Sequence, residues 1–213
     1  MAESVVTAIA ADPRNPDNVR VKVDGAIYVV DLSVLTALNL HIGKHVTPET
    51  IHKLEGAADE SRGKTRALRL LAGRAYTEHQ MRQRLARAKI SDIAIERVIA
   101  WLLERGYIDD QRFAEAWVED RAERKGAGPL RLNQELTQRG IPRAMARQAI
   151  DAAMDNERME AIATQHAKRR LARYQDLARR ETYAKMYAFL QRRGFTSDVI
   201  RRVLNRLIDD KFA

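Results

Sequence analysis

Residues 105–117 read RGYIDDQRFAEAW, a stretch typical of one helix ending and another beginning. Gly106 can adopt the left-handed conformation that ends a helix, since it has no Cβ to clash. The two aspartates that follow can cap the next helix and complement the positive end of its dipole. Phe113 and Trp117 lie four residues apart and so share one face of that helix. The stretch predicts a tight joint between two helical units.

The helix before this joint has a pattern that occurs three times. Apolar residues recur with the same spacing as Ile95, Val98, Ile99 and Leu102, as Ala146, Ala149, Ile150 and Ala153, and as Ile200, Val203, Leu204 and Leu207. Before each set stands an apolar pair five residues apart: Leu85 and Ile90, Leu136 and Ile141, Leu190 and Phe195. The copies follow each other at 136−85 = 51 and 190−136 = 54 residues, the period of a repeated supersecondary unit. Each unit is predicted to contain three helices.

The first part of the chain has a different pattern. An apolar, β-branched run over 5–10 is followed by turn-forming residues over 12–18. Valines then alternate with basic residues over 19–23, and Asp24-Gly25 is a hairpin signal before a returning strand at 26–32. This predicts a small β-rich module, too small to bury much by itself, that packs on the first helical unit.

We therefore predict a mainly α protein. It is an elongated array of three tandem three-helix repeats, over residues 47–108, 109–156 and 157–213, preceded by the β-hairpin-containing module of residues 1–46.

Composition narrows the functional class. The chain has no Cys, and its net charge of +9 is uneven: residues 64–213 hold 32 Lys or Arg and 20 Asp or Glu, whereas residues 1–63 carry a net negative charge. A basic C-terminal part points to an anionic partner, although a solvated helical surface is the alternative. No secretory signal and no membrane-length apolar run is present, so a cytoplasmic protein without membrane contact, most simply a monomer, is expected.

No catalytic grouping is evident. There is no phosphate-binding G-x-x-x-x-G-K motif, and His41 and His45 are separated by a glycine that argues against a helical metal-binding face. The sequence thus predicts no enzyme, no metal site and no cofactor.

Basic residues outside the apolar stripes of the last repeat are the candidate binding residues. They are Lys168, Arg169, Arg173, Arg192, Arg193, Arg201, Arg202 and Arg206, which together could form one positive surface. The aromatic residues, among them Phe113 and Trp117, sit at stripe or joint positions and are predicted to be core, so the base-stacking signature of single-strand binders is weak.

The joint motif G-Y-I-D-D-x-R-F-A, preceded by Tyr76-Thr77 at the start of a helix, resembles that of the RecX family of RecA regulators. The matching residues are Gly106, Tyr107, Asp109, Asp110, Arg112, Phe113 and Ala114, whose role is expected to be mainly structural. This chain has Ile108 where the family often has Leu, and Gln80-Met81 where it often has Glu-Leu. The resemblance extends over roughly residues 65–212.

The resemblance implies an inhibitor of the RecA recombinase in DNA repair and the SOS response. Such a protein binds the RecA–DNA filament and limits its extension, strand exchange and co-protease activity. Sequence-independent contact with DNA is a further expectation. The alternative is a helix-turn-helix DNA-binding protein that acts independently of RecA, because each second-to-third helix pair has the outline of that motif.

Overall fold

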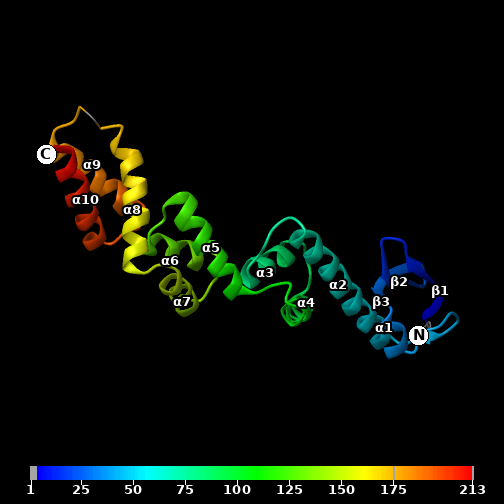
Figure 1. Cartoon of the computed structure of the whole chain (residues 1–213). Coiled ribbons are helices and arrows are strands. Elements are labelled where there is room, and N and C mark those ends of the chain that lie inside the picture. Colours follow the sequence, from blue (N-terminus) through cyan, green and yellow to red (C-terminus); the bar gives the residue numbers. More distant parts are fainter. Residues whose placement is uncertain (1–3, 175, 213) are drawn as a thin grey trace. The chain divides into compact units, whose positions relative to one another are not determined.

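The computed structural model of the chain describes residues 4–174 and 176–212, with side chains up to residue 209 (Figure 1). The chain divides into two compact units, Met1–Ile108 and Asp109–Ala213. The first unit contains a small sheet followed by one helical triplet, and the second contains two triplets. The prediction of a mainly α protein, with three three-helix repeats after a β-rich module, is confirmed.

The sheet is antiparallel with strand order β3-β2-β1-β4. Its strands are β1 (Ser4–Asp12), β2 (Asn15–Val23), β3 (Ala26–Asp31) and β4 (His45–Val46), and a short helix α1 (Ser33–Ala37) follows β3. Asp24 and Gly25 have φ of 47° and 90°, as a two-residue hairpin turn with primed geometry requires. The predicted turn over 12–18 is too long. Asp12 pairs with Asn15, so two residues suffice to reverse the chain and β2 begins at Asn15.

The module packs on helix α2 (Pro48–Leu71), as predicted. Leu54 of α2 lies in one apolar cluster with Val6, Val21 and Val30 of the sheet. Asn18 Nδ2 donates a hydrogen bond of 2.9 Å to Ser61 Oγ, which satisfies two buried polar side chains at this contact. The sheet therefore packs on the first part of α2, while the rest of the first repeat has an apolar cluster of its own.

Helix α2 continues through both of its glycines. At Gly63 a Cβ would lie 2.9 Å from Val98 Cγ2 of helix α4, so this glycine lets the two helices approach closely. Helices α2, α3 (Glu78–Arg87) and α4 (Asp92–Glu104) form the first repeat. Its core includes Met81, Leu85 and Leu102, all fully buried.

The second unit holds the other two repeats, which share one apolar core. Repeat 2 consists of α5 (Asp110–Lys125), α6 (Pro129–Thr137) and α7 (Arg143–Ala153). Repeat 3 consists of α8 (Asn156–Leu171), α9 (Arg179–Arg192) and α10 (Ser197–Phe212). In Figure 1, α9 and α10 lie beside α8.

The repeated apolar pairs have a common structural role, which is to end the second helix of each triplet. The later residue of each pair donates its backbone N–H to the carbonyl of the earlier one, at 3.3 Å in repeat 1, 3.1 Å in repeat 2 and 3.3 Å in repeat 3. This is the Schellman helix end, which needs one residue at positive φ between the pair. Gly140 and Gly194 provide it at 85° and 88°, while Lys89 adopts 57° in the first copy. A missing glycine thus does not break the repeat.

Candidate polyanion-binding surface

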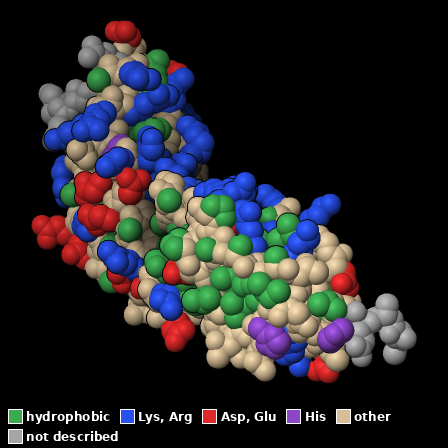
Figure 2. Space-filling model, turned by 90° about the vertical axis from the view of Figure 1, so that its right-hand side faces the viewer, with side chains coloured by type: hydrophobic (Ala, Val, Ile, Leu, Met, Phe, Trp, Pro, Cys, Tyr) green, Lys and Arg blue, Asp and Glu red, His purple; other side chains and the backbone are tan. Residues whose placement is uncertain are grey.

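The eight predicted basic residues lie on the three helices of repeat 3 or directly after them. Lys168 and Arg169 are in the last turn of α8, and Arg173 follows that helix. Arg192 ends α9, Arg193 caps it, and the other three lie on α10. All are exposed except Arg193, which is half-buried. Lys and Arg side chains also cover much of the molecular face in Figure 2, whereas Asp and Glu side chains gather in smaller groups.

Two of the eight residues, Arg202 and Arg206, lie next to an acid of the same repeat. Glu160 of α8 accepts from Arg202 at 2.5 Å and lies 3.8 Å from Arg206, so an acid neutralises this side. Lys168 and Arg206 line a shallow groove of about 450 Å³ together with Glu157 and Glu160. That groove contains both charges in equal number. The sequence pattern could not reveal this, because Glu160 meets α10 only in the folded chain.

In a second groove, every charged side chain of the lining is basic. This α5–α9 groove has a volume of about 590 Å³ and is lined by Arg124, Lys125, Arg131, Phe189, Arg192 and Arg193. Its residues come from the end of α5, the start of α6 and the end of α9. Arg124 pairs with Asp120 at 3.0 Å and Arg131 with Glu135 at 2.9 Å. Among the described residues, Lys125, Arg192 and Arg193 form no ion pair.

Sequence reasoning found only Arg192 and Arg193 of this groove. The other three basic residues flank the segment Gly126-Ala127-Gly128-Pro129, which the sequence identifies as a break between helices. The sequence does contain part of this information. Arg124 and Lys125 lie in the last turn of α5, where the helix dipole stabilises positive charge. Nothing in the sequence indicates that this break meets the end of α9.

The backbone itself builds the groove. Gly128 N–H donates to Arg193 O at 2.7 Å, and Leu130 N–H donates to Gly194 O at 3.1 Å, so the start of α6 is joined to the end of α9. A Cβ on Gly128 would lie 2.6 Å from the carbonyl carbon of Gly194, and one on Gly194 would lie 2.4 Å from Arg131 N. Only glycine fits at both positions. This close contact brings the arginines of two repeats together.

The positive charges in and beside the groove lower the pKa values of Arg193 and His166. Burial lowers the pKa of Arg193, and the neighbouring charges of Arg131 and Arg170 lower it further. Burial likewise lowers the pKa of His166, with the charge of Arg193 as the next cause, although a hydrogen bond to the Glu123 backbone opposes the shift. Positive charge is therefore concentrated around Arg193, which has no ion-pair partner among the described residues, although Glu135 pairs with the neighbouring Arg131. Such a concentration of like charge favours the binding of an anion.

The joint motif is structural on both of its sides. In the first unit Gly106 has φ of 66°, and Tyr107 N–H donates to Leu102 O at 2.9 Å, another Schellman end. In the second unit Asp109 is the N-cap of α5 and accepts from Arg112 N–H at 2.9 Å. Asp110 begins α5. These placements agree with the predicted helix end and cap.

The aromatic part of that prediction needs correction. Ala114 is fully buried, but Phe113 and Trp117 are only half-buried and pack on the edge of the core. Their rings stack at 5.8 Å. The four-residue spacing places both on one face, and that face lies at the boundary between core and solvent, where two arginines cover Trp117.

Trp117 is held by three charged side chains. The guanidinium carbons of Arg121 and Arg139 lie 4.3 Å and 3.6 Å from its ring centroid, and its Nε1 donates to Glu135 Oε2 at 3.1 Å. Glu135 also pairs with Arg121 at 3.2 Å. The indole is thus enclosed by its own chain and is unsuited to stack on a base.

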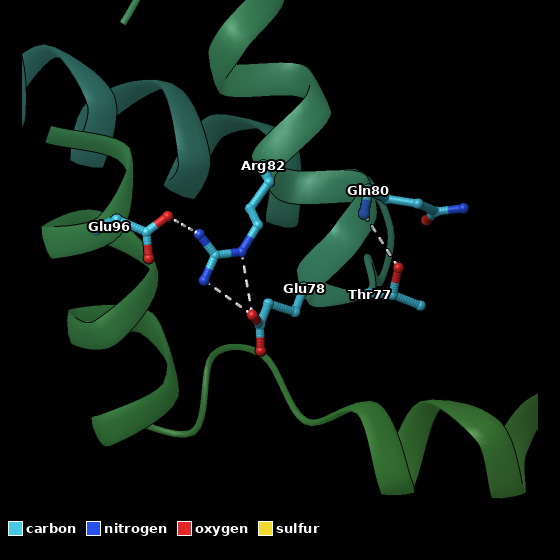
Figure 3. Close-up of polar contacts among 5 residues, drawn as sticks. All are labelled: Thr77, Glu78, Gln80, Arg82 and Glu96. Atoms are coloured by element: carbon cyan, nitrogen blue, oxygen red, sulfur yellow. Dashed lines mark hydrogen bonds and ion pairs between the residues drawn. The ribbon is translucent and has the colours of Figure 1, made fainter. Parts of the chain in front are cut away.

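In the first repeat, hydrogen bonds between charged side chains also link two helices (Figure 3). Thr77 caps α3 by accepting from Gln80 N–H at 3.2 Å. Arg82 of α3 donates from its Nε to Glu78 at 3.0 Å and also bonds to Glu96 of α4. The arginine therefore links the start of α3 to the neighbouring helix.

Membrane-spanning and metal-binding features are both absent from residues 4–174 and 176–212. No helix there has the length and apolar character needed to cross a membrane. In the same residues, no three His, Cys, Asp or Glu side chains are grouped so that they could hold a metal ion.

Comparison with known proteins places these features in a family. Models of the first, second and third three-helix domains of RecX match residues 64–102, 109–150 and 157–204. A protein of Bacillus licheniformis named regulatory protein RecX is 30% identical over 200 residues, covering 93% of this chain and 76% of that protein. One of the same name from Halorhodospira halophila is 40% identical over 148 residues, covering 68% and 88%.

Solved structures share the fold. A crystal structure of regulatory protein RecX has a TM-score of 0.80 at 22% identity, covering 95% of this chain and 99% of that one. RecX from Lactobacillus salivarius has a TM-score of 0.66 at 24% identity, covering 71% and 97%. With three matching domain models and relatives at this identity and coverage, the chain belongs to the RecX family of regulatory proteins.

Proposed function

We propose that this chain is a non-enzymatic inhibitor of the RecA recombinase. It binds the RecA–DNA filament and limits filament extension, strand exchange and co-protease activity, and it thereby acts in DNA repair and the SOS response. Membership of a family of regulatory proteins supports the regulatory role. The observation that carries the binding part is the α5–α9 groove, whose charged lining residues are all basic.

The groove suits a polyanion, namely acidic protein surface or DNA phosphate. Arginine side chains present planar donors that match carboxylate and phosphate oxygens, and the crowding of Arg193 by Arg131 and Arg170 leaves positive charge to be neutralised. Exposed basic residues of α8 and α10 extend the proposed contact. Of these, Lys168, Arg169, Arg173 and Arg201 form no ion pair among the described residues, while Arg202 and Arg206 share Glu160.

The test is the ATPase activity of RecA on single-stranded DNA, with this chain present at substoichiometric amounts. We expect the wild-type chain to reduce the rate of ATP hydrolysis. The double variant Arg192→Glu, Arg193→Glu should need about tenfold more protein for the same effect, since about 1.4 kcal/mol of lost binding energy is a factor of ten. We expect the fold to tolerate reversal at Arg193, because a glutamate there would have a charge opposite to those of Arg131 and Arg170.

The matched control is Arg143→Glu, Arg147→Glu on α7. Both arginines are exposed, belong to the same unit and lie outside the α5–α9 groove, and the change in net charge is the same. The control should inhibit like the wild type. A wild-type chain that leaves the ATPase unchanged would contradict the proposed function, and equal loss in both variants would contradict the role of the groove. Tight binding to one duplex sequence without RecA would instead support the helix-turn-helix alternative.

A further inference from the structure

A groove in the first unit lies along one face of α2. This α2 groove has a volume of about 1040 Å³. Its floor runs along α2 from His52 to Arg69, with β3 and the β1–β2 turn on one side and the start of α4 on the other. It is built entirely from the unit Met1–Ile108 and is separate from the α5–α9 groove.

Basic residues dominate the lining, with seven Lys or Arg against three Asp or Glu. Two of the acids are occupied by the fold. Asp12, whose side chain is only 8% exposed, pairs with Arg20 at 2.9 Å. Asp59 accepts from the backbone N–H of Ser91 at 2.6 Å and from Arg62 at 2.5 Å. Asp12 and Asp59 therefore bind groups of the groove itself, and other basic residues of the lining have no acid paired with them.

Three of those basic residues are available for a ligand. Arg14, Arg66 and Arg69 are exposed, and none forms an ion pair among the residues that the structure describes. Arg66 and Arg69 follow Arg62 at helical spacing, so Arg62, Arg66 and Arg69 form a basic stripe along one face of α2.

The groove walls also carry exposed apolar side chains. Ile27 of β3 and Ile93 of α4 are 61% and 70% exposed, although isoleucine is one of the residues most often buried. Tyr28 is the one aromatic residue in the described lining, and it is half-buried and packed against the sheet core. Because β3 is the edge strand of the sheet, this wall has no further strand beside it in the described residues.

We propose that the α2 groove binds an extended acidic peptide that carries apolar side chains. The stripe on α2 would neutralise its carboxylates, and Ile27 and Ile93 would cover its apolar residues. A nucleic-acid strand fits less well, because single-strand sites use aromatic side chains as stacking platforms. Helix α2 rises about 25 Å between His52 and Arg69, at about 1.5 Å per residue. An extended peptide of about eight residues covers that length. The inference does not depend on the proposed action on RecA.

The probe is a fluorescein-labelled peptide of about eight residues that alternates Asp or Glu with Leu, measured by fluorescence anisotropy with the full chain. Alternation places the carboxylates on one side of an extended peptide and the leucines on the other. We expect saturable binding that weakens as salt is raised. A peptide with Ser in place of Leu should bind about tenfold more weakly, which separates the apolar contribution from charge.

Two variants locate the site. Arg66→Glu with Arg69→Glu should weaken binding by about tenfold or more, and Ile93→Ser should weaken binding of the Leu peptide but not of the Ser peptide. The matched control, Arg84→Glu with Arg87→Glu on α3, reverses two exposed charges in the same unit outside the groove and should bind like the wild type. Circular dichroism and the melting temperature identify any variant that is unfolded.

Several results would overturn the inference. Folded groove variants that bind like the wild type would remove the site, and an equal loss in the α3 control would reduce the binding to general charge attraction. An oligothymidylate of equal length that binds more tightly than the peptide and responds to the same groove variants would assign the groove to nucleic acid instead.

Discussion

The contact between Gly128 and Gly194 gives the most specific stability prediction. In Gly194→Ala, the new Cβ would lie 2.4 Å from Arg131 N and 2.6 Å from Arg131 Cβ, and φ is 88°. The left-handed conformation costs an alanine about 1–2 kcal/mol. Relief of the clash must move the start of α6 away, which weakens the Gly128–Arg193 and Leu130–Gly194 hydrogen bonds, each contributing about 0.5–1.5 kcal/mol. We expect a total loss of about 2–5 kcal/mol from the free energy of unfolding of the second unit.

The control is Gly106→Ala, at the same position of a helix end. Gly106 also has positive φ, 66°, but a Cβ added there would meet no atom within 4 Å, so only the conformational cost of about 1–2 kcal/mol applies. Urea unfolding is followed by tryptophan fluorescence. The first unit contains Trp101 and the second contains Trp117, so Trp101→Phe in every variant makes the signal report on the second unit. For Gly106→Ala, which lies in the first unit, circular dichroism supplies the measurement.

If Gly194→Ala loses no more than Gly106→Ala, the close backbone contact between the two repeats is not formed as described. A second consequence follows from the same geometry. Because the contact positions Arg131 and Arg193, Gly194→Ala should also weaken inhibition of the RecA ATPase at temperatures where the variant remains folded.

Three further predictions concern single side chains. Phe113→Ala should lower the free energy of unfolding by about 2 kcal/mol in urea titrations. Because Phe113 is half-buried, this is less than the loss of about 3–5 kcal/mol for a fully buried Phe, and a larger loss would place Phe113 in the core. The lowered pKa of His166 means that the unfolded chain takes up a proton first, so stability is full above about pH 6.5 and falls as the pH is lowered toward the folded-state pKa. In His166→Gln that part of the pH dependence of the urea midpoint should disappear, and its persistence would assign the effect to other groups. Arg82→Ala should cost about 1 kcal/mol, and a double-mutant cycle with Glu96→Ala should show coupling; additive losses would mean that the link between α3 and α4 contributes nothing.

Local sequence signals predicted the repeats well, because helix ends are determined by nearby residues. The pair Leu136 and Ile141, with Gly140 between them, contains the whole chemistry of a Schellman end. Lys89 shows the limit of that signal, since the first repeat forms the same end without glycine. The apolar spacing alone was enough to identify the unit.

Contacts between distant segments were not predictable from those signals. Gly128 and Gly194 are 66 residues apart (194−128), and their need for glycine arises only because the two backbones meet. Likewise Glu160 neutralises Arg202, which helical periodicity alone assigned to an open positive face. Charge and periodicity therefore predict the basic residues of α8 and α10, but only Arg192 and Arg193 of the α5–α9 groove.

The most direct test of the account is binding of the labelled chain to preformed RecA filaments on single-stranded DNA, kept intact by a slowly hydrolysed ATP analogue. Fluorescence anisotropy then measures binding separately from any loss of filament. We predict saturable binding by the wild type and by Arg143→Glu, Arg147→Glu, with affinity about tenfold weaker for Arg192→Glu, Arg193→Glu. A wild-type chain that fails to bind these filaments would contradict the central claim.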